Sequence, residues 1–184
     1  MLRVGLYGGT FDPIHNGHLH VIRELISRNI VDRLLVVPAG EPRLRESAPV
    51  ASGADRRQMC VEAVNSLEAD IKNKVEVNPI EVLRQGPSYA IDTVEAIAAT
   101  YEAATIALIL GTDAYEKIDQ WHRAAELKSM VEFIVIDRPD FPGAPNLEIG
   151  ALAVSATDIR SKKSDQIPAP VAAYIKEHNL YASK

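Results

Sequence analysis

The chain has 184 residues, enough for one ordinary domain with a substantial hydrophobic core, and its 47% hydrophobic and 24% charged residues exclude extensive disorder. The formal net charge of -5 argues against nucleic acid as the main partner. A single cysteine, Cys60, excludes an intrachain disulfide and a multi-cysteine metal site.

The first third of the chain alternates apolar and amphipathic segments. The run RVGLY (3–7) predicts a buried strand that stops at two glycines, and residues 17–29 carry apolar side chains at helical spacing. DRLLVVPAG (32–40) predicts a second buried strand. Residues 39–54 hold two prolines and two glycines without periodicity, which predicts a long loop of the kind that often forms a lid.

The same alternation continues to the C-terminus. Helices are predicted at about 55–68 and 91–98 and within 155–163 and 168–180, and strands at 75–82, 105–111, 132–139 and 147–154. Cys60 lies in the first of these helices, where we expect a small buried hydrophobe. The pattern predicts an α/β fold, a doubly wound, mostly parallel open sheet with helices on both faces. We expect residues 1–184 to form one domain with a small helical part from about 155.

In an open parallel sheet the ligand crevice lies beyond the carboxyl ends of the strands. The loops at those ends are the candidates for chemistry: 8–18, 38–45, 111–113, 138–139 and 154–157. No apolar run approaches the roughly 20 residues needed to cross a bilayer. Nor does the N-terminus have a basic flank followed by a long apolar segment, so we expect a soluble cytoplasmic protein without a signal peptide and no membrane partner.

The first loop, GGTFDPIHNGH (8–18), suggests a phosphate site. Gly8 and Gly9 can adopt positive φ and let a ligand approach backbone N–H groups, and Gly17 does the same at the predicted helix start. The first turn of a helix offers free N–H groups and a positive dipole end. His15, just before the helix, and His18, in its first turn, can then face one anion.

Two other interpretations of this loop stay open on sequence. The histidines could be capping or packing groups of an ordinary turn, or His15 and His18 could hold a metal, although no further Cys or His cluster supports that. The loop is not the dinucleotide motif G-x-G-x-x-G, so hydride transfer gains no support.

The stretch SATDIR (155–160) is a second candidate. Ser155 could cap a helix whose third residue is Asp158. Alternatively, Arg160 could reach back over the helix start and bind phosphate with its planar fork of donors.

Three further residues have two interpretations each. Trp121, the only tryptophan, could be a core anchor, although its immediate neighbours are polar. Asp113 could hold ribose hydroxyls or cap a helix. Arg138 ends a predicted strand and could be a surface charge or a ligand contact.

Taken together, these segments resemble the nucleotidyltransferase superfamily that carries a His-x-Gly-His motif, and within it the bacterial nicotinate-nucleotide adenylyltransferase family. The similarity extends over nearly the whole chain, through GGTFDPIHNGH, PAGEP, DRRQM, GPSYAIDTVE, GTDAYEKIDQWHRAAEL, VIDRP and VSATDIR in the family's order. The first and last are marks of the superfamily, whereas SYAIDTVE and the WHR segment indicate this member.

The resemblance implies transfer of the adenylyl group of ATP to nicotinate mononucleotide, with phosphate-bound Mg²⁺. It implies catalytic roles for His15, His18 and Arg160, and places the mononucleotide at Tyr89, Ala90, Trp121 and Arg138. The implied ATP site comprises these residues: Gly8, Gly9, Thr10, Phe11, His15, Gly17, His18, Gly111, Asp113, Ser155, Thr157 and Arg160.

The sequence departs from the family at three places. The segment EPRLR (41–45) lacks the lysine that similar enzymes direct at ATP phosphates, and Arg43 or Arg45 is the candidate substitute. Ala156 replaces a hydroxyl residue beside Ser155. Ala90 stands where the family usually has threonine, so backbone N–H groups there would do more of the binding.

Several functions stay open at this stage. The acceptor could be nicotinamide mononucleotide or phosphopantetheine, although SYAIDTVE and Trp121 argue against the latter. A non-catalytic nucleotide-binding module would not require both histidines, and a structural domain would leave the polar motifs at the strand ends unexplained. A homo-oligomer is also left open.

Overall fold

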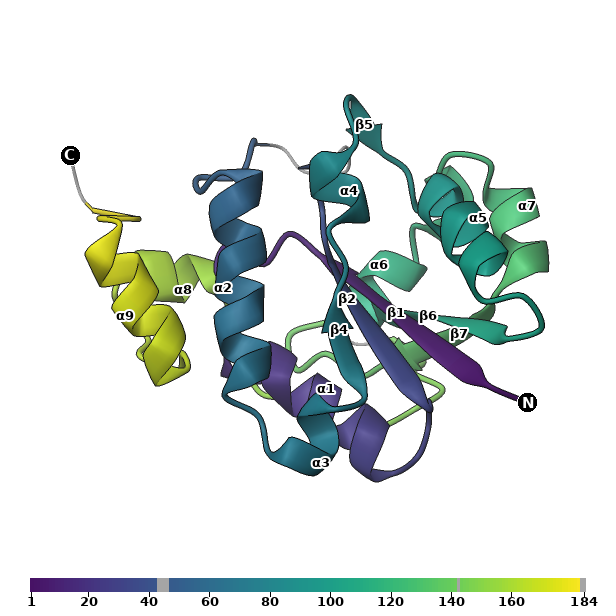
Figure 1. The fold of residues 1–184 in the computed structure, drawn as a ribbon, viewed down its shortest axis with the longest axis horizontal. Coiled ribbons are helices and arrows are strands. Elements are labelled where there is room, and N and C mark those ends of the chain that lie inside the picture. Colours follow the sequence, from purple (N-terminus) through teal and green to yellow (C-terminus); the bar gives the residue numbers. More distant parts are fainter. Residues whose placement is uncertain (43–46, 142, 183–184) are drawn as a thin grey trace.

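A computed structural model describes residues 1–42, 47–141 and 143–182. Its centre is a parallel sheet in which the strands run in the spatial order β4 (Val75–Val77), β2 (Arg33–Pro38), β1 (Arg3–Gly9), β6 (Thr105–Gly111) and β7 (Glu132–Ile136) (Figure 1). The chain builds outward from β1 in one direction and from β6 in the other, so the strand order reverses between these two strands. Such a reversal opens a crevice at the carboxyl edge of the sheet.

Alternate residues of each strand enter different hydrophobic layers, as the pleat of a strand requires. Leu6 of β1 packs in one layer with the helices α5 (Ala90–Thr100) and α7 (Ala124–Met130), whereas Tyr7 packs in the other with α1 (Asn16–Ser27) and α2 (Gly53–Asn65). Cys60 of α2 is fully buried, as expected. The predicted doubly wound fold with helices on both faces is confirmed.

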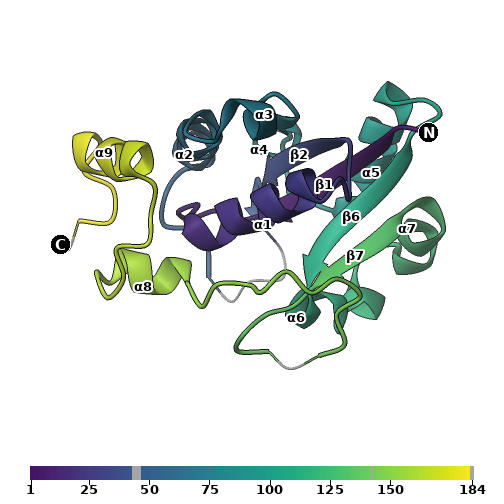
Figure 2. The same ribbon diagram turned by 90° about the horizontal axis from the view of Figure 1, so that it is seen from below.

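Short elements connect these layers. Two-residue strands β3 (Glu41–Pro42) and β5 (Pro87–Ser88) pair in parallel above the carboxyl edge. The remaining short elements are α3 (Ala69–Lys72), α4 (Ile80–Leu83), α6 (Thr112–Tyr115), the 3₁₀ helix η1 (Ile118–Gln120) and α8 (Ala156–Arg160). The last helix, α9 (Ala169–Glu177), packs against α2 at the end of the molecule where α8 also lies (Figure 2).

Two predicted strands differ from the structure. The segment 75–82 is a strand only over its first three residues, because the Asn78 side chain accepts the Ile80 N–H (3.0 Å) and α4 begins there. The segment 147–154 forms only an isolated bridge between Leu147 and Ile136. The Asp137 carboxylate accepts its backbone N–H groups at Ile149 (2.6 Å) and Ala151 (2.8 Å), which removes them from strand pairing.

No helix in the described ranges has the length and apolar character needed to cross a membrane. The long loop expected at 39–54 is interrupted by β3, and α2 begins inside it at Gly53.

We expect Asp137→Ala to lower the free energy of unfolding by about 1–3 kcal/mol, because two backbone donors lose their acceptor. Urea unfolding followed by circular dichroism measures the change. Asp140→Ala removes a carboxylate from an exposed position three residues further on and is the control. Equal effects of the two substitutions would contradict this account of the segment.

Candidate active site

The loop after β1 is shaped by close packing of aromatic rings. The Phe11 ring is 2% exposed, and a Cβ on Gly9 would lie 2.8 Å from its Cζ, so residue 9 must be glycine. Phe11 packs edge-on against Tyr7 and His18, with ring centroids 5.7 and 4.9 Å away. Phe11 is expected among the ATP contacts. In the structure its buried ring packs against Tyr7 and His18 and supports the loop.

The three loop glycines do not adopt the positive φ expected of them. None has a positive φ; among the described glycines only Gly86 and Gly150 do. A Cβ on Gly8 would meet no atom within 4 Å, so its backbone is open to a ligand. A Cβ on Gly17 would lie 3.1 Å from the His15 ring, so this glycine lets the imidazole lie flat on the start of α1.

The two histidines form a stacked pair at the start of α1. His15 is the N-cap residue and His18 lies in the first turn, as expected, with ring centroids 3.8 Å apart and planes inclined by 25°. The backbone N–H of His15 donates to Nδ1 of His18 (3.1 Å). His18 Nδ1 is therefore an acceptor, and the proton of the neutral ring lies on Nε2, which is left to donate to a ligand.

Both rings are neutral in the ligand-free protein. Burial, reinforced by the charge of Arg138, lowers the pKa of His15 to about 4. Burial, His15 and Arg138 lower the pKa of His18 well below its usual value. His15 Nδ1 is buried and has no hydrogen-bond partner among the described residues. A buried polar atom of this kind favours an incoming partner.

The segment 155–160 meets this loop in space. Ser155 Oγ accepts the Asp158 N–H (3.1 Å), so the capping interpretation is confirmed. Arg160 also reaches back, with Nη1 donating to the Asp12 carbonyl (2.6 Å) and Nη2 to Thr157 Oγ1 (3.2 Å). The capping and phosphate-binding interpretations are therefore compatible, because Ser155 makes the cap and the phosphate would be bound by a different side chain, Arg160.

Asp113 and Arg138 lie together at the ends of β6 and β7. The N-cap of α6 is Gly111, so Asp113 is not the helix cap. Its carboxylate folds back beside Gly111, 3.9 Å from Nε of Arg138. Arg138, expected with Tyr89 and Trp121, instead lies near enough to the histidines to lower their pKa values.

A cavity of about 550 Å³ joins the carboxyl edge of the sheet to the start of α5. Gly8, Gly9 and Thr10 line it together with Tyr89, Ala90 and Trp121, so the structure brings these predicted residues together. The predicted catalytic residues His15, His18 and Arg160 are not among its lining residues. The Trp121 side chain packs against the α5 layer, and its Nε1 is buried without a partner in the described chain. Trp121 is thus both a packing group and a wall of the cavity.

Three residues of the site were missed by sequence reasoning. His122 lines the cavity and stacks on Tyr89, with centroids 4.3 Å apart. Glu81 also lines it; burial raises the pKa of this carboxyl, against a hydrogen bond from Thr93 (2.8 Å). Arg56 is 1% exposed and donates to backbone carbonyls of the loops, among them that of Thr10. The sequence did contain a signal for two of them. His122 is next to Trp121, and Arg56 places a charge on the apolar face of α2.

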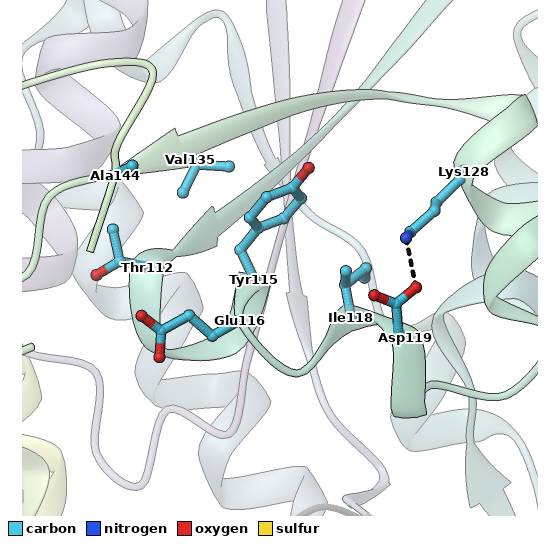
Figure 3. A pocket seen from close by; sticks show the side chains of 8 residues that line it. All are labelled: Thr112, Tyr115, Glu116, Ile118, Asp119, Lys128, Val135 and Ala144. Carbon is cyan, nitrogen blue, oxygen red and sulfur yellow. Dashed lines mark hydrogen bonds and ion pairs between the residues drawn. The ribbon is translucent and has the colours of Figure 1, made fainter.

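The lid candidates Arg43 and Arg45 lie outside the described residues. A second cavity, of about 370 Å³, shares no lining residue with the first (Figure 3). Its carboxylates are Glu116 and Asp119, and its only cation among the described lining residues, Lys128, is paired with Asp119 (2.5 Å). This arrangement does not suit a phosphate, so the larger cavity is the candidate active site.

The fold and cavity agree with similarities to known proteins. The Cytidylyltransferase-like family matches residues 6–162. A probable nicotinate-nucleotide adenylyltransferase of Bacillus pumilus is 34% identical over the full length of both chains, and one of Clavibacter michiganensis is 34% identical over 99% of this chain and 95% of its own. The chain belongs to the nicotinate-nucleotide adenylyltransferase family. Its expected family is confirmed.

Solved structures show the same fold in this family. Nicotinic acid mononucleotide adenylyltransferase of Plasmodium falciparum, complexed with NaAD, matches with a TM-score of 0.81 and 22% identity over 98% of each chain. A putative family enzyme of Vibrio parahaemolyticus has a TM-score of 0.73 with 18% identity, over 100% of this chain and 98% of its own.

The buried neutral histidines predict acid sensitivity. Because the pKa of His15 is about 4 in the folded state against 6.5 ordinarily, the unfolded chain binds more protons between these values. The free energy of unfolding therefore falls as the pH falls through this window, by about 3 kcal/mol for His15 alone. We expect His15→Gln to remove that part of the pH dependence in urea unfolding at about pH 7 and about pH 4.5.

His178→Gln is the matched control, because His178 is exposed on the C-terminal side of α9. A His15→Gln chain that loses as much stability in acid as the unaltered chain would contradict the assignment of His15 as neutral in the folded state.

Proposed function

We propose that this chain transfers the adenylyl group of ATP to nicotinate mononucleotide, giving deamido-NAD and pyrophosphate. The observation that carries the proposal is the cavity that runs from Gly8–Thr10 to Tyr89, Ala90 and Trp121. The loop that supplies Gly8 to Thr10 continues outside the cavity lining to the histidine pair at the start of α1, which suits phosphates. The aromatic rings of Tyr89 and Trp121 line the cavity and suit a pyridine. The family's curated relatives support this reaction.

The geometry favours a reaction without a protein base. The phosphate of a mononucleotide, with a second pKa near 6, is mostly dianionic at neutral pH and attacks the α-phosphorus of ATP directly. The P–O bond to that phosphate forms as the bond to pyrophosphate breaks. Catalysis then consists of positioning the two reactants and stabilising the charge on the phosphates.

We assign the charge stabilisation to the histidine pair. His18 would donate from Nε2 to the α-phosphate or the leaving pyrophosphate, since its Nδ1 is already held by the His15 backbone. His15 is stacked on His18 and would bring a second imidazole to the bound nucleotide. An anion beside the rings favours their protonated forms and so opposes the lowering of pKa caused by burial.

The remaining contacts follow from where the side chains lie. We propose that Thr10 and the amides of Gly8 and Gly9 seat the ATP phosphates. Arg160, whose guanidinium lies beside the same loop, would hold the β- and γ-phosphates with Ser155 and Thr157 from the start of α8. We assign Gly111 and Asp113, at the end of β6, to the ribose, with Arg138 placed to add positive charge near the histidines.

We assign the pyridine ring to the aromatic end of the cavity. Trp121 would stack on the ring, and Tyr89 and Ala90, at the start of α5, would contact its edge. Among the described residues no side chain caps the N-terminus of α5, so its N–H groups could read the ring carboxylate that distinguishes nicotinate from nicotinamide.

We also propose Mg²⁺ as the ion that accompanies ATP and neutralises part of its phosphate charge. The described residues contain no group of three or more His, Cys, Asp or Glu side chains placed to hold a metal. Phosphate oxygens and water would therefore supply its ligands, as Mg²⁺ accepts readily.

The proposed reaction is tested by supplying ATP and Mg²⁺ with each acceptor separately and measuring pyrophosphate release. We expect release with nicotinate mononucleotide and a kcat/KM at least tenfold lower with nicotinamide mononucleotide, since a site that binds the carboxylate leaves polar groups unpaired with the amide, at a cost of about 1–3 kcal/mol. Phosphopantetheine as the preferred acceptor would change the assigned reaction. No release with any acceptor would leave only a nucleotide-binding module.

His18→Ala is expected to lower kcat by about 10²–10³-fold, the usual cost of removing a donor aimed at developing charge. The measurement is steady-state pyrophosphate release at saturating ATP and mononucleotide. His178→Ala, on the exposed end of α9, is the control and should retain full activity. A fall of less than threefold in the His18 variant would remove this side chain from the mechanism.

A further inference from the structure

Asp12 is a buried carboxylate at the base of the phosphate loop. Asp12 is 2% exposed. Its two carboxylate oxygens accept three hydrogen bonds from segments far apart in the sequence. Oδ2 accepts the Val50 N–H (2.7 Å), while Oδ1 accepts the Ala51 N–H (3.1 Å) and the Tyr181 hydroxyl (2.6 Å). A buried charge requires such partners, because it has lost its contact with water.

Arg160 lies beside this carboxylate without binding it closely. Its Nη1 donates to the Asp12 backbone carbonyl at 2.6 Å but is 3.9 Å from Asp12 Oδ2. The three other donors occupy the carboxylate, so the guanidinium does not close into a tight fork-to-fork pair with Asp12. Its charge therefore stays available at the mouth of the loop.

Tyr181 is well suited to hold this arrangement. It follows α9 near the C-terminus, with a left-handed φ of 58°, and its ring packs partly buried against the α1 and α2 layer. Burial and the neighbouring Asp12 carboxylate raise the pKa of Tyr181 well above its ordinary value. The phenol donates its hydrogen bond to Oδ1 of Asp12.

We propose that Tyr181 is a positioning residue for Arg160: its hydroxyl satisfies the Asp12 carboxylate and so keeps the guanidinium free to bind the ATP phosphates. The inference rests on the proposed function, since it takes Arg160 as a phosphate ligand. It gives the C-terminal segment a part in the reaction, although Tyr181 is not a lining residue of the cavity.

Removing the Tyr181 hydroxyl would favour a direct ion pair between Asp12 and Arg160. Oδ1 of Asp12 would retain only the Ala51 N–H among its present partners. The nearest cation is Arg160, which needs to move only a short way to pair with the carboxylate. A guanidinium paired in this way offers less charge and fewer donors to a phosphate.

The test compares Tyr181→Phe with Tyr174→Phe. Both changes remove a phenol hydroxyl that donates to an aspartate, since Tyr174, on α9, donates to Asp55 Oδ1 (2.9 Å) on α2. The affinity for ATP is measured by calorimetry and the KM of each substrate by pyrophosphate release. Thermal unfolding of each variant sets a temperature at which all are folded.

We expect the Kd and KM for ATP to rise by about three- to tenfold in Tyr181→Phe, part of the usual strength of a hydrogen bond to a charged group. The KM for the mononucleotide should stay within about twofold, and Tyr174→Phe should change neither value by more than about twofold. Equal ATP affinities in the two variants would overturn the inference.

A double-mutant cycle separates positioning from a structural effect. In an Arg160→Ala chain, Tyr181→Phe should cause no further loss of ATP affinity, because the residue through which it acts is gone. The same loss in both backgrounds would overturn the inference, as would an unaltered chain that binds no ATP. ATP binding without pyrophosphate release would contradict the proposed reaction and leave the role of Tyr181 intact.

Discussion

The site depends on a buried arginine that ties together the loops at the carboxyl edge of the sheet. Arg56, 1% exposed on α2, donates to the carbonyls of Thr10 (2.8 Å), Ala39 (2.6 Å), Gly40 (3.2 Å) and Ala51 (3.3 Å). These carbonyls belong to the loops after β1 and β2 and to the segment before α2. A buried cation is tolerated only with such acceptors, and in return it holds three loops at fixed spacing.

The local pattern of apolar residues was enough to predict most helices and strands. It did not predict that the segments 75–82 and 147–154 depart from strand structure. The apolar runs of β1, β2, β6 and β7 and the helical spacing of α1 and α5 are each visible within a short window. The runs at 75–82 and 147–154 also contain apolar residues at strand-like spacing, yet the side chains of Asn78 and Asp137 capture their backbone N–H groups. Capture of this kind depends on three-dimensional proximity or a single polar residue, which periodicity does not register.

In the site, too, local pattern predicts the loops at the strand ends but not the contacts between residues far apart in the sequence. Because parallel strands end at one edge of a sheet, the pattern of strands and loops was enough to predict that the loop after β1 and the start of α5 meet, as Gly8 and Tyr89 do in the cavity. The contact of Tyr181 with Asp12 joins residues 169 positions apart, and Arg56 reads locally as one charge in a helix. Side chains that bind other loops leave no local signal, so sequence reasoning missed these supporting residues.

The arrangement of layers explains how the two proposed substrates are brought into line. The histidine pair rests on the layer of α1 and α2, whereas Tyr89 and Trp121 belong to the layer of α5 and α7, on the other face of the sheet. The cavity lies on the α5 and α7 face and reaches the carboxyl edge of the sheet at Gly8, Gly9 and Thr10, in the loop that leads to the histidines. An in-line reaction therefore depends on the rigidity of the sheet itself, because no single helix carries both halves of the site.

Arg123 extends that rigidity to the aromatic end of the cavity. It follows Trp121 and His122, has a left-handed φ of 53°, and donates to Glu95 on α5 (2.7 Å) and Glu126 on α7 (2.5 Å). Exposed ion pairs of this kind contribute little to stability. Their effect is geometric. They hold the turn that carries Trp121 and His122 against α5, whose first residue, Ala90, also lines the cavity.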